Sequence, residues 1–278
     1  MKRINFYILG VSSLLLASLL TAIFASNNLG QSEKIAFTVK SDKNNISLGE
    51  VVNLEFEFFN QGETAVQIPN GGVMAGNIEV FIAKKGESYR KYFRSDWGRI
   101  DGEVDLITLA PNQNRKIDNT NATILWNGKP NYSHLNPDAA KRADKQDNKI
   151  LTDYAFPDAG IYLVKAASCL IDELKGCSIS IESEPIEIRV NEPVGEDLEV
   201  WNQIKGNRGI AMLMQKGLFD TGKEVEKQKL TTQVEQIIER YPNSIYSSYL
   251  KPNLEKSRAR ETKRDEFYKN IKPSQKPE

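Results

Sequence analysis

Hydrophobic and polar residues alternate along much of residues 33–191. In the segment VVNLEFEFFN every second position is large and apolar, namely Val52, Leu54, Phe56 and Phe58. A period of two over this length predicts a strand with one buried and one solvated face. Similar runs, separated by Gly, Asn or Pro, predict strands at 35–39, 64–69, 77–85, 89–93, 105–109, 122–126, 160–168 and 177–190. Because no helical pattern lies between most of these runs, we expect an antiparallel β-sandwich rather than a parallel α/β sheet.

After Pro193 the spacing of apolar positions changes from every second residue to the 3.6-residue period of a helix. Apolar residues then recur at helical spacing, first at Leu198, Trp201 and Ile204, and again within a predicted helix over about residues 223–241. The sequence from residue 251 onward is dominated by charge, as in a solvated helix face. We therefore expect an α-helical tail of one or two helical hairpins over residues 195–271, followed by a disordered end at 272–278.

Residues 127–153 interrupt the strand pattern. The stretch is polar and has no strand periodicity, although NPDAAKRADKQ predicts a short helix with Asn136 as its cap and Pro137 at its first position. Long connections of this kind in compact domains are either functional or simply mobile. The sequence does not choose between the two.

The first twenty-five residues indicate export. Lys2 and Arg3 precede a run without any charge from Phe6 to Ala25, which is the pattern of a secretory signal. The run is long for a cleaved signal, and Ile23 stands at the −3 position if cleavage follows Ala25. Both a cleaved signal peptide and an uncleaved N-terminal anchor remain open. We expect a periplasmic or extracellular protein, or one tethered to the outer face of the cytoplasmic membrane.

Composition and charge narrow the class of partner. The chain of 278 residues is 40% hydrophobic and 27% charged, which is typical of a folded globular protein. Lys+Arg and Asp+Glu both number 37, so no excess of positive charge attracts nucleic acid. Nucleic acid is therefore excluded as a partner, and contact with a membrane is expected only through the N-terminal segment.

The two cysteines, Cys169 and Cys177, are expected to form a disulfide. They are separated by LIDELKG, which resembles a hairpin turn between two apolar runs, and an even pair in an exported protein favours a bridge. Two unpaired thiols are the alternative. A metal site is disfavoured because no other cysteine completes a ligand set.

One motif indicates a more specific fold. Asp158, Gly160 and Tyr162 form the D-x-G-x-Y pattern at a turn into a strand. The pattern resembles the tyrosine corner of immunoglobulin-like domains, in which the Tyr hydroxyl bonds to the backbone upstream. The resemblance covers about residues 33–191 and includes the start of a strand at Leu48-Gly49-Glu50. The residue two positions after the Tyr is Val164, so the inter-sheet disulfide of antibody domains is absent, and the Tyr is expected to have a structural role only.

The helical tail carries a second resemblance. The sequence RYPNSIY, from Arg240 to Tyr246, resembles the helix junctions of tetratricopeptide-like hairpins in exported bacterial proteins. A single junction does not indicate a repeat array, which needs about three units. The segment from Leu48 to Gly62 is also loosely similar to a bacterial proteinase-inhibitor β-domain. The chain thus resembles an exported bacterial protein with an immunoglobulin-like domain and a short tetratricopeptide-like tail, and it points to no specific family.

Catalytic and cofactor motifs are absent from the sequence. The one histidine, His134, lies in a polar stretch without a second ligand or a G-x-S-x-G motif, and no metalloprotease, Walker or dinucleotide motif occurs. An acidic loop, Asp96, Asp101, Glu103 and Asp105, is a candidate for weak calcium binding. Trp97 in the same loop is a candidate platform for a sugar. A solvated loop explains both equally simply, so no cofactor, metal or catalytic residue is assigned.

Two functions follow as hypotheses. The first is a non-catalytic exported binding or assembly protein of the cell envelope with a protein partner, whose helical tail docks on another protein; it is not an enzyme. The alternative is an exported hydrolase of an envelope polymer that uses acids such as Asp96 and Asp101 near Trp97, because glycoside cleavage needs two suitably spaced carboxylates.

Overall fold

The computed structural model describes most of the chain between residues 34 and 270. The described ranges are 34–71, 77–93, 106–117, 122–128, 153–172, 176–219, 221 and 223–270. The expected export segment at 1–25, the expected disordered end at 272–278 and nearly all of 127–153 lie outside these ranges.

Two main sheets form the sheet region, which we define as residues 35–191. The smaller sheet contains, in spatial order, β1 (Ile35–Ser41), β3 (Val52–Asn60) and β8 (Asn114–Lys116), with β9 (Thr123–Ile124) also paired to β3. The larger sheet contains β2 (Asn45–Ser47), β14 (Ile186–Asn191), β12 (Gly160–Asp172), β5 (Ile78–Lys84) and β6 (Arg90–Tyr92), with β13 (Gly176–Glu182) also paired to β12. All these pairs are antiparallel except the parallel pair of β2 with β14.

Two further strand pairs complete the sheet region. They are β4 (Val66–Pro69) with β7 (Leu106–Leu109), and β10 (Trp126–Asn127) with β11 (Asp153–Tyr154). Asn127 pairs with Asp153 in the second of them. The polar stretch 127–153 therefore begins and ends on one antiparallel ladder, which brings its two ends together.

The period-two pattern of β3 is confirmed. Its residues alternate in burial, and Leu54, Phe56 and Phe58 are at most 1% exposed. Phe37 of β1 pairs with Phe58 in the ladder, and their rings stack at 4.6 Å between centroids. The buried faces of both main sheets belong to one hydrophobic cluster. Two mainly antiparallel sheets on a shared core are compatible with the predicted β-sandwich.

The predicted run at 177–190 is two strands rather than one. β13 and β14 are separated by residues 183–185 and pair with different parts of β12. Pro185 lies in this gap, and proline has no backbone N–H to donate to a ladder. β14 therefore pairs along the first half of β12, and β13 pairs along the second half.

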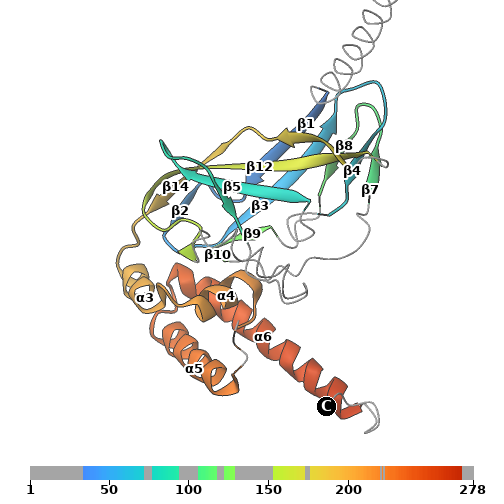
Figure 1. Cartoon of the computed structure of the whole chain (residues 1–278). Coiled ribbons are helices and arrows are strands. Elements are labelled where there is room, and N and C mark those ends of the chain that lie inside the picture. The colour runs from blue at the N-terminus through green and yellow to red at the C-terminus, as the bar shows by residue number, and fades with distance from the viewer. Residues whose placement is uncertain are drawn as a thin grey trace, which may run out of the picture.

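Four helices form the helical region, which we define as residues 196–270. They are α3 (Glu196–Ile204), α4 (Arg208–Lys216), α5 (Glu224–Arg240) and α6 (Ile245–Asn270). This confirms a C-terminal helical part, with α6 running without a break through Pro252. The helices lie at one end of the sheets, opposite the end at which β1 begins (Figure 1).

The buried side chains of the two regions form one continuous cluster. It includes Val164 and Ile188 of the larger sheet together with Val200, Met212 and Tyr246 of the helices. Within the described ranges, no helix is both long and apolar enough to cross a membrane. The sheet and helical regions therefore share one core.

Candidate functional site

Three consecutive residues of the sheet region, Leu48-Gly49-Glu50, contact the helical region, and we call this set of contacts the junction. The Tyr246 hydroxyl on α6 donates a hydrogen bond to the backbone carbonyl of Leu48 at 2.5 Å. Tyr246 is fully buried. Burial is also the main reason why the pKa of its hydroxyl lies far above the usual value. The tyrosine thus stays neutral and holds α6 to the sheet region.

Gly49 is the closest backbone approach at the junction. Its φ is +72°, and a Cβ placed on it would lie 2.1 Å from Cζ3 of Trp201 on α3. A left-handed conformation and a contact this short both require glycine. The ring of Trp201 therefore packs directly on the backbone between the two other junction residues.

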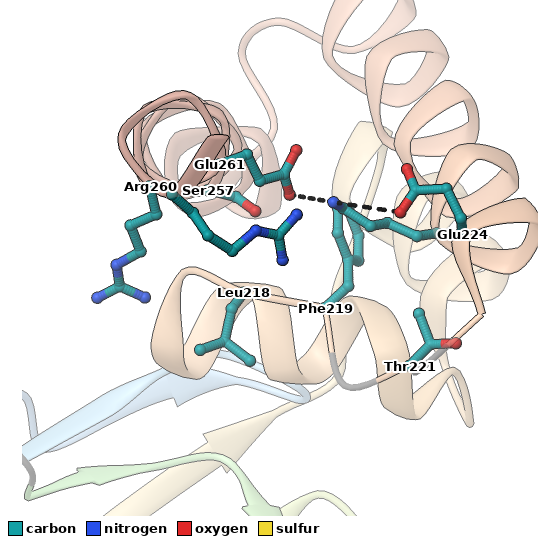
Figure 2. A pocket seen from close by; sticks show the side chains of 9 residues that line it. Leu218, Phe219, Thr221, Glu224, Ser257, Arg260 and Glu261 are labelled. Atoms are coloured by element: carbon teal, nitrogen blue, oxygen red, sulfur yellow. Dashed lines mark ion pairs between the residues drawn. The ribbon is translucent and has the colours of Figure 1, made fainter. Parts of the chain in front are cut away.

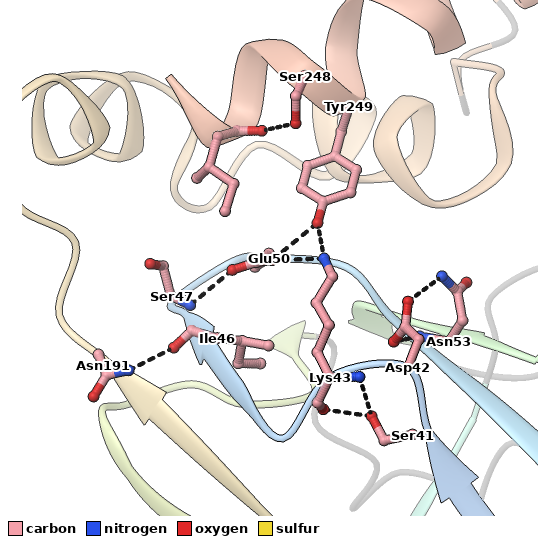
Figure 3. Close-up of polar contacts among 11 residues, drawn as sticks. Ser41, Asp42, Lys43, Ile46, Ser47, Glu50, Asn53, Asn191, Ser248 and Tyr249 are labelled. Carbon is pink, nitrogen blue, oxygen red and sulfur yellow. Dashed lines mark hydrogen bonds and ion pairs between the residues drawn. The ribbon is translucent and has the colours of Figure 1, made fainter. Parts of the chain in front are cut away.

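The Glu50 side chain is buried and accepts three hydrogen bonds (Figure 3). The donors are Lys43 Nζ at 2.6 Å, the backbone N–H of Ser47 at 2.9 Å and the Tyr249 hydroxyl at 2.9 Å. Lys43 Nζ also contacts the Tyr249 hydroxyl. A buried carboxylate needs such partners, because an unpaired charge in the interior costs several kcal/mol.

The cluster shifts the pKa of both partners of Glu50 upward. Burial by itself lowers the pKa of Lys43, but hydrogen bonds and charge interactions with Glu50 and Tyr249 outweigh it. Burial raises the pKa of Tyr249 and Glu50 adds to the rise, while Lys43 opposes it. At neutral pH Lys43 therefore keeps its positive charge and Tyr249 stays neutral.

A series of four aromatic rings in contact also joins the sheet region to the helical region. Trp126 contacts Tyr154 edge to face, Tyr154 contacts Trp201 in the same way, and Trp201 stacks on Tyr246. The successive centroid distances are 5.0, 5.0 and 6.1 Å. Aromatic pairs in these geometries contribute about 0.5–1.5 kcal/mol each beyond area burial. The series passes from β10 and β11 to α3 and α6, so it joins the two regions.

A buried glutamine of α4 adds a polar connection. Gln215 donates to the hydroxyl of Tyr92 at 2.8 Å and to the carbonyl of Thr123 at 2.9 Å. Its carbonyl accepts from the backbone N–H of Trp126 at 3.3 Å. Because buried polar groups are costly when unpaired, these bonds fix where α4 sits on the strands.

The start of α6 is fixed by α3. One carboxylate oxygen of Asp197 accepts from the hydroxyl of Ser244 at 2.7 Å and from the backbone N–H of Ile245 at 2.8 Å. A carboxylate at this position satisfies a free helix N–H and interacts favourably with the positive end of the helix dipole. The direction of α6 is thus set by contacts with both α3 and the sheet region.

A second place of interest is a pocket of about 330 Å³ in the helical region. Its walls come from the segment after α4, the first turn of α5 and the second half of α6 (Figure 2). Leu218 and Phe219 supply apolar surface, and Lys227, Arg260 and Arg264 supply positive charge. Lys227 forms ion pairs with Glu261 and, at 3.9 Å, with Glu224. We call this cavity the helical pocket.

The two places differ in the chemistry that they allow. At the junction each polar group of the Glu50 cluster already bonds another member of the cluster, so its groups are used to connect the regions. In the helical pocket the arginines keep donors available. Arg260 Nη1 makes only long contacts of 3.3 and 3.4 Å to the carbonyls of Lys216 and Gly217. The helical pocket is therefore the better candidate for binding a ligand.

The three residues of the predicted tyrosine corner, Asp158, Gly160 and Tyr162, lie close together in the structure. The Tyr162 hydroxyl donates to the carbonyl of Asp158 at 3.0 Å and accepts from its N–H at 3.3 Å, the contact on which the tyrosine-corner interpretation depends. Gly160 between them has a φ of +150°. These three residues lie about the turn into β12, on the sheet region and apart from the helical pocket.

The cysteines lie on neighbouring strands of one hairpin. In the ladder Cys169 of β12 is opposite Ser180, and Cys177 of β13 is opposite Ile171, with an irregularity between Leu170 and Ile171. This agrees with the predicted hairpin at this point in the sequence. The disulfide itself stays a prediction.

The remaining sequence candidates fall outside the described ranges. They are the acidic loop of Asp96, Asp101, Glu103 and Asp105, the nearby Trp97, and His134. Within the ranges that are described, no group of three or more His, Cys, Asp or Glu side chains is placed to share a metal ion.

The sequence reasoning missed the junction and the helical pocket. Leu48-Gly49-Glu50 was interpreted only as the start of a strand, and the helical tail was expected to dock on another protein. In the structure α3, α4 and the first half of α6 pack on the chain's own sheet region, and docking of the tail on another protein stays a prediction. One signal could have indicated this packing: Tyr246 and Tyr249 lie one helical turn apart, which places two aromatic residues on one face.

Comparisons with known proteins do not assign a family. No family model matches the chain, and no curated protein matches it. Among solved structures, the sporulation control protein Spo0M of Bacillus subtilis aligns at 11% identity with a TM-score of 0.28, covering 61% of this chain and 54% of that one. The alignment thus spans about half of the Spo0M chain.

Two other solved structures align about as weakly. The CARDB domain of a Pyrococcus furiosus protein, solved with di-metal ions, has 10% identity and a TM-score of 0.24, covering 57% of this chain and 94% of that one. A β-glucosidase of Listeria innocua has 13% identity and a TM-score of 0.26, covering 58% of this chain and 17% of that one. Likenesses at this level carry no argument about the function of the chain.

Proposed function

We propose that this chain is a non-catalytic exported binding protein of the cell envelope, in which the sheet region holds the helical region in a fixed position toward a protein partner. The observation that carries the proposal is the junction. A buried carboxylate with three donors, a glycine under a tryptophan ring and a buried tyrosine hydroxyl connect the two regions. Such contacts give one relative orientation rather than a flexible hinge.

The arrangement of β1 and the helices supports presentation of the helical region away from a membrane. β1 begins at one end of the sheet region, and the helices lie at the other (Figure 1). If the N-terminal segment tethers the chain, the helical region points away from the bilayer. If the segment is cleaved, the same surface is presented by a released protein.

We also infer that the sheet region is immunoglobulin-like. The inference rests on the Tyr162–Asp158 contact and on antiparallel strands around β12, which pairs with both β5 and β14. Fold alone does not establish function, so this inference adds a scaffold to the proposal and no activity. The hydrolase hypothesis depends on Asp96 and Asp101, and no contact of the described residues favours it.

The test is capture of a partner from envelope extract. The exported chain, purified and immobilised, is incubated at micromolar concentration with detergent-solubilised envelope proteins, and bound proteins are identified by mass spectrometry. The matched control is the Gly49→Ala variant, in which the junction is disturbed but the exposed surface of the helical region is unchanged. We expect a protein that the wild-type chain retains and the variant retains less. Recovery of nothing by the wild-type chain would contradict the proposal.

A further inference from the structure

We propose that the helical pocket binds an acidic segment of a protein partner, with a carboxylate against Arg260 and Arg264 and a neighbouring apolar side chain against Leu218. This inference rests on the proposed binding function and names the chemistry of the partner. Four features of the pocket carry it: its size, its unequal distribution of charge, its apolar wall and its rigidity.

The volume suits a side chain rather than a large cofactor. At about 330 Å³ the helical pocket lies near the lower end of the range for ligand sites, about 300–1,000 Å³. It is built from three separate segments, the loop after α4, the start of α5 and the second half of α6. One or two residues of an extended peptide fit such a volume.

The lining of the pocket has more cationic than acidic side chains, three against two. Among the described residues Arg260 forms no ion pair, and Arg264 forms one at 3.7 Å with its exposed neighbour Asp265. Both acids of the pocket, Glu224 and Glu261, are directed to Lys227 instead. Figure 2 shows Arg260 and Glu224 on opposite sides of the pocket. Glu261 lies on the same helix as the arginines, but its carboxylate is paired with Lys227. A carboxylate beside the arginines would therefore meet a net positive charge.

The two arginines are spaced for joint recognition. Residues four apart on a helix lie on one face, about 5–6 Å between Cβ atoms, and Arg260 and Arg264 both line the helical pocket. Guanidinium groups bind carboxylates through paired, charge-assisted hydrogen bonds, which are stronger and more directional than those of lysine. The arrangement favours a carboxylate over a neutral amide.

The apolar wall explains why the partner also needs an apolar residue. Leu218 is 39% exposed, whereas the adjacent Phe219 is only 8% exposed. Covering Leu218 removes apolar surface from water, which favours binding. Free acidic residues without an apolar neighbour would leave this surface exposed and bind more weakly.

The pocket is held in shape before any ligand arrives. Asn253 of α6 donates to the carbonyl of Met214 at the end of α4 at 3.0 Å. Lys227 of α5 is tied to Glu261 of α6. These contacts fix α4 and α5 against α6, and a preformed site loses less conformational entropy on binding.

The test measures binding of a defined probe. A fluorescein-labelled hexapeptide, GLELDG with an amidated C-terminus, is titrated with the exported chain by fluorescence anisotropy at low salt, beside the matched neutral peptide GLQLNG. We expect the acidic peptide to bind at least about tenfold more tightly than the neutral one, since charge-assisted hydrogen bonds are lost in the neutral peptide. Equal binding of the two peptides, or no binding of either at millimolar protein, would overturn the proposal.

A pair of variants of equal charge locates the site. The double variant Arg260→Gln/Arg264→Gln removes two cations inside the pocket, and Arg258→Gln/Lys263→Gln removes two from the same helix outside it. We expect about a tenfold loss of affinity in the first double variant and less than about a twofold loss in the second. Equal losses of affinity in the two double variants would show that the peptide is attracted unspecifically to the charge of α6, and would overturn the helical pocket as the binding site.

Two further measurements keep the result interpretable. Because Arg260 also contacts the end of α4, the single variant Arg264→Gln is measured too; the ion pair of Arg264 with Asp265 is exposed. The affinity of this variant for the acidic peptide should fall at least about threefold. An unchanged affinity would overturn the joint role of the arginines. The envelope capture is repeated with the Arg260→Gln/Arg264→Gln variant. If this variant retains the partner as well as the wild-type chain does, the pocket is not the binding site, but the proposed binding function stands. A wild-type chain that retains nothing would overturn the function itself.

Discussion

The two halves of α6 face different surroundings. In the first half, Ile245–Leu254, the side chains of Tyr246, Leu250 and Leu254 are at most 4% exposed. In the second half, Glu255–Asn270, nearly all side chains are exposed, including Phe267 at 63%. The first half packs on the sheet region and α4, whereas the second forms ion pairs with α5 and extends away from the sheets (Figure 1).

The difference lies in the residues of the two halves of α6, one of which packs in the core while the other is exposed to solvent. Apolar and aromatic residues at four-residue spacing bury the first half, and charged residues keep the second half in water. Because the helix is continuous, the contacts of the buried half set the direction of the exposed half. We therefore expect changes at the junction to alter both the stability of the protein and its binding of a partner, and changes in the exposed half to alter binding alone.

The largest expected effect is at Gly49. In the Gly49→Ala variant the added methyl group would overlap the Trp201 ring, and the φ of +72° would be strained. Together these should lower the free energy of unfolding by about 3 kcal/mol, measured by urea denaturation. Gly206→Ala is the matched control, since its φ is +74° but nothing lies within 4 Å. It should lose only the strain of about 1–2 kcal/mol, and an equal loss in both variants would mean that Trp201 does not pack tightly on Gly49.

A smaller effect is expected when the buried acid is neutralised. Glu50→Gln removes a charge that Lys43, Tyr249 and the Ser47 N–H all contact. The expected loss is about 2 kcal/mol in the free energy of unfolding, because hydrogen bonds to a charged group are stronger than neutral ones. Glu187→Gln is the control, since its ion pair with Lys85 is exposed and should contribute less than about 1 kcal/mol. If the two variants lost the same amount, the junction would be no more specific than a surface contact.

Alkaline pH should weaken the junction. The pKa values of Lys43 and Tyr249 lie above their usual values of 10.5 and 10.0 in the folded protein. The folded state therefore keeps protons that the unfolded state has lost, and stability falls as pH rises from about 10 through the folded pKa values. We expect a lower urea midpoint at pH 11 than at pH 8. The fall should be smaller in the Lys43→Met/Tyr249→Phe variant, and the same fall in both proteins would assign the effect to other groups.

The smallest effect is expected at the far end of α6. Phe267 and Tyr268 contact each other and are 63% and 44% exposed. The variant Phe267→Ser/Tyr268→Ser should change the free energy of unfolding by less than about 0.5 kcal/mol, since it alters only surface. Leu250→Ala in the buried half is the control and should cost about 3 kcal/mol by leaving a cavity. A large loss in the first variant would show that the exposed half also supports the fold.

Local sequence patterns predicted most of the elements. The alternation in β3 and the helical spacing in α5 both correspond to observed elements with the expected residues buried, such as Phe56 in β3 and Val234 in α5. The short strands β2, β8 and β11 were not predicted, because two or three residues carry too little pattern. Their pairing is decided by neighbouring strands instead.

Periodicity and composition by themselves determined a sheet-rich part followed by helices, because burial of one face repeats at a fixed spacing along each element. Only the tertiary structure decided what Leu48-Gly49-Glu50 contacts. Leu48 and Tyr246 are 198 positions apart in the chain, and no local pattern encodes a contact at that separation. The helical pocket is likewise made of three segments that meet only because α4, α5 and α6 pack together. The physical reason is that local sequence selects the form of an element, whereas the complementarity of distant side chains selects its neighbours.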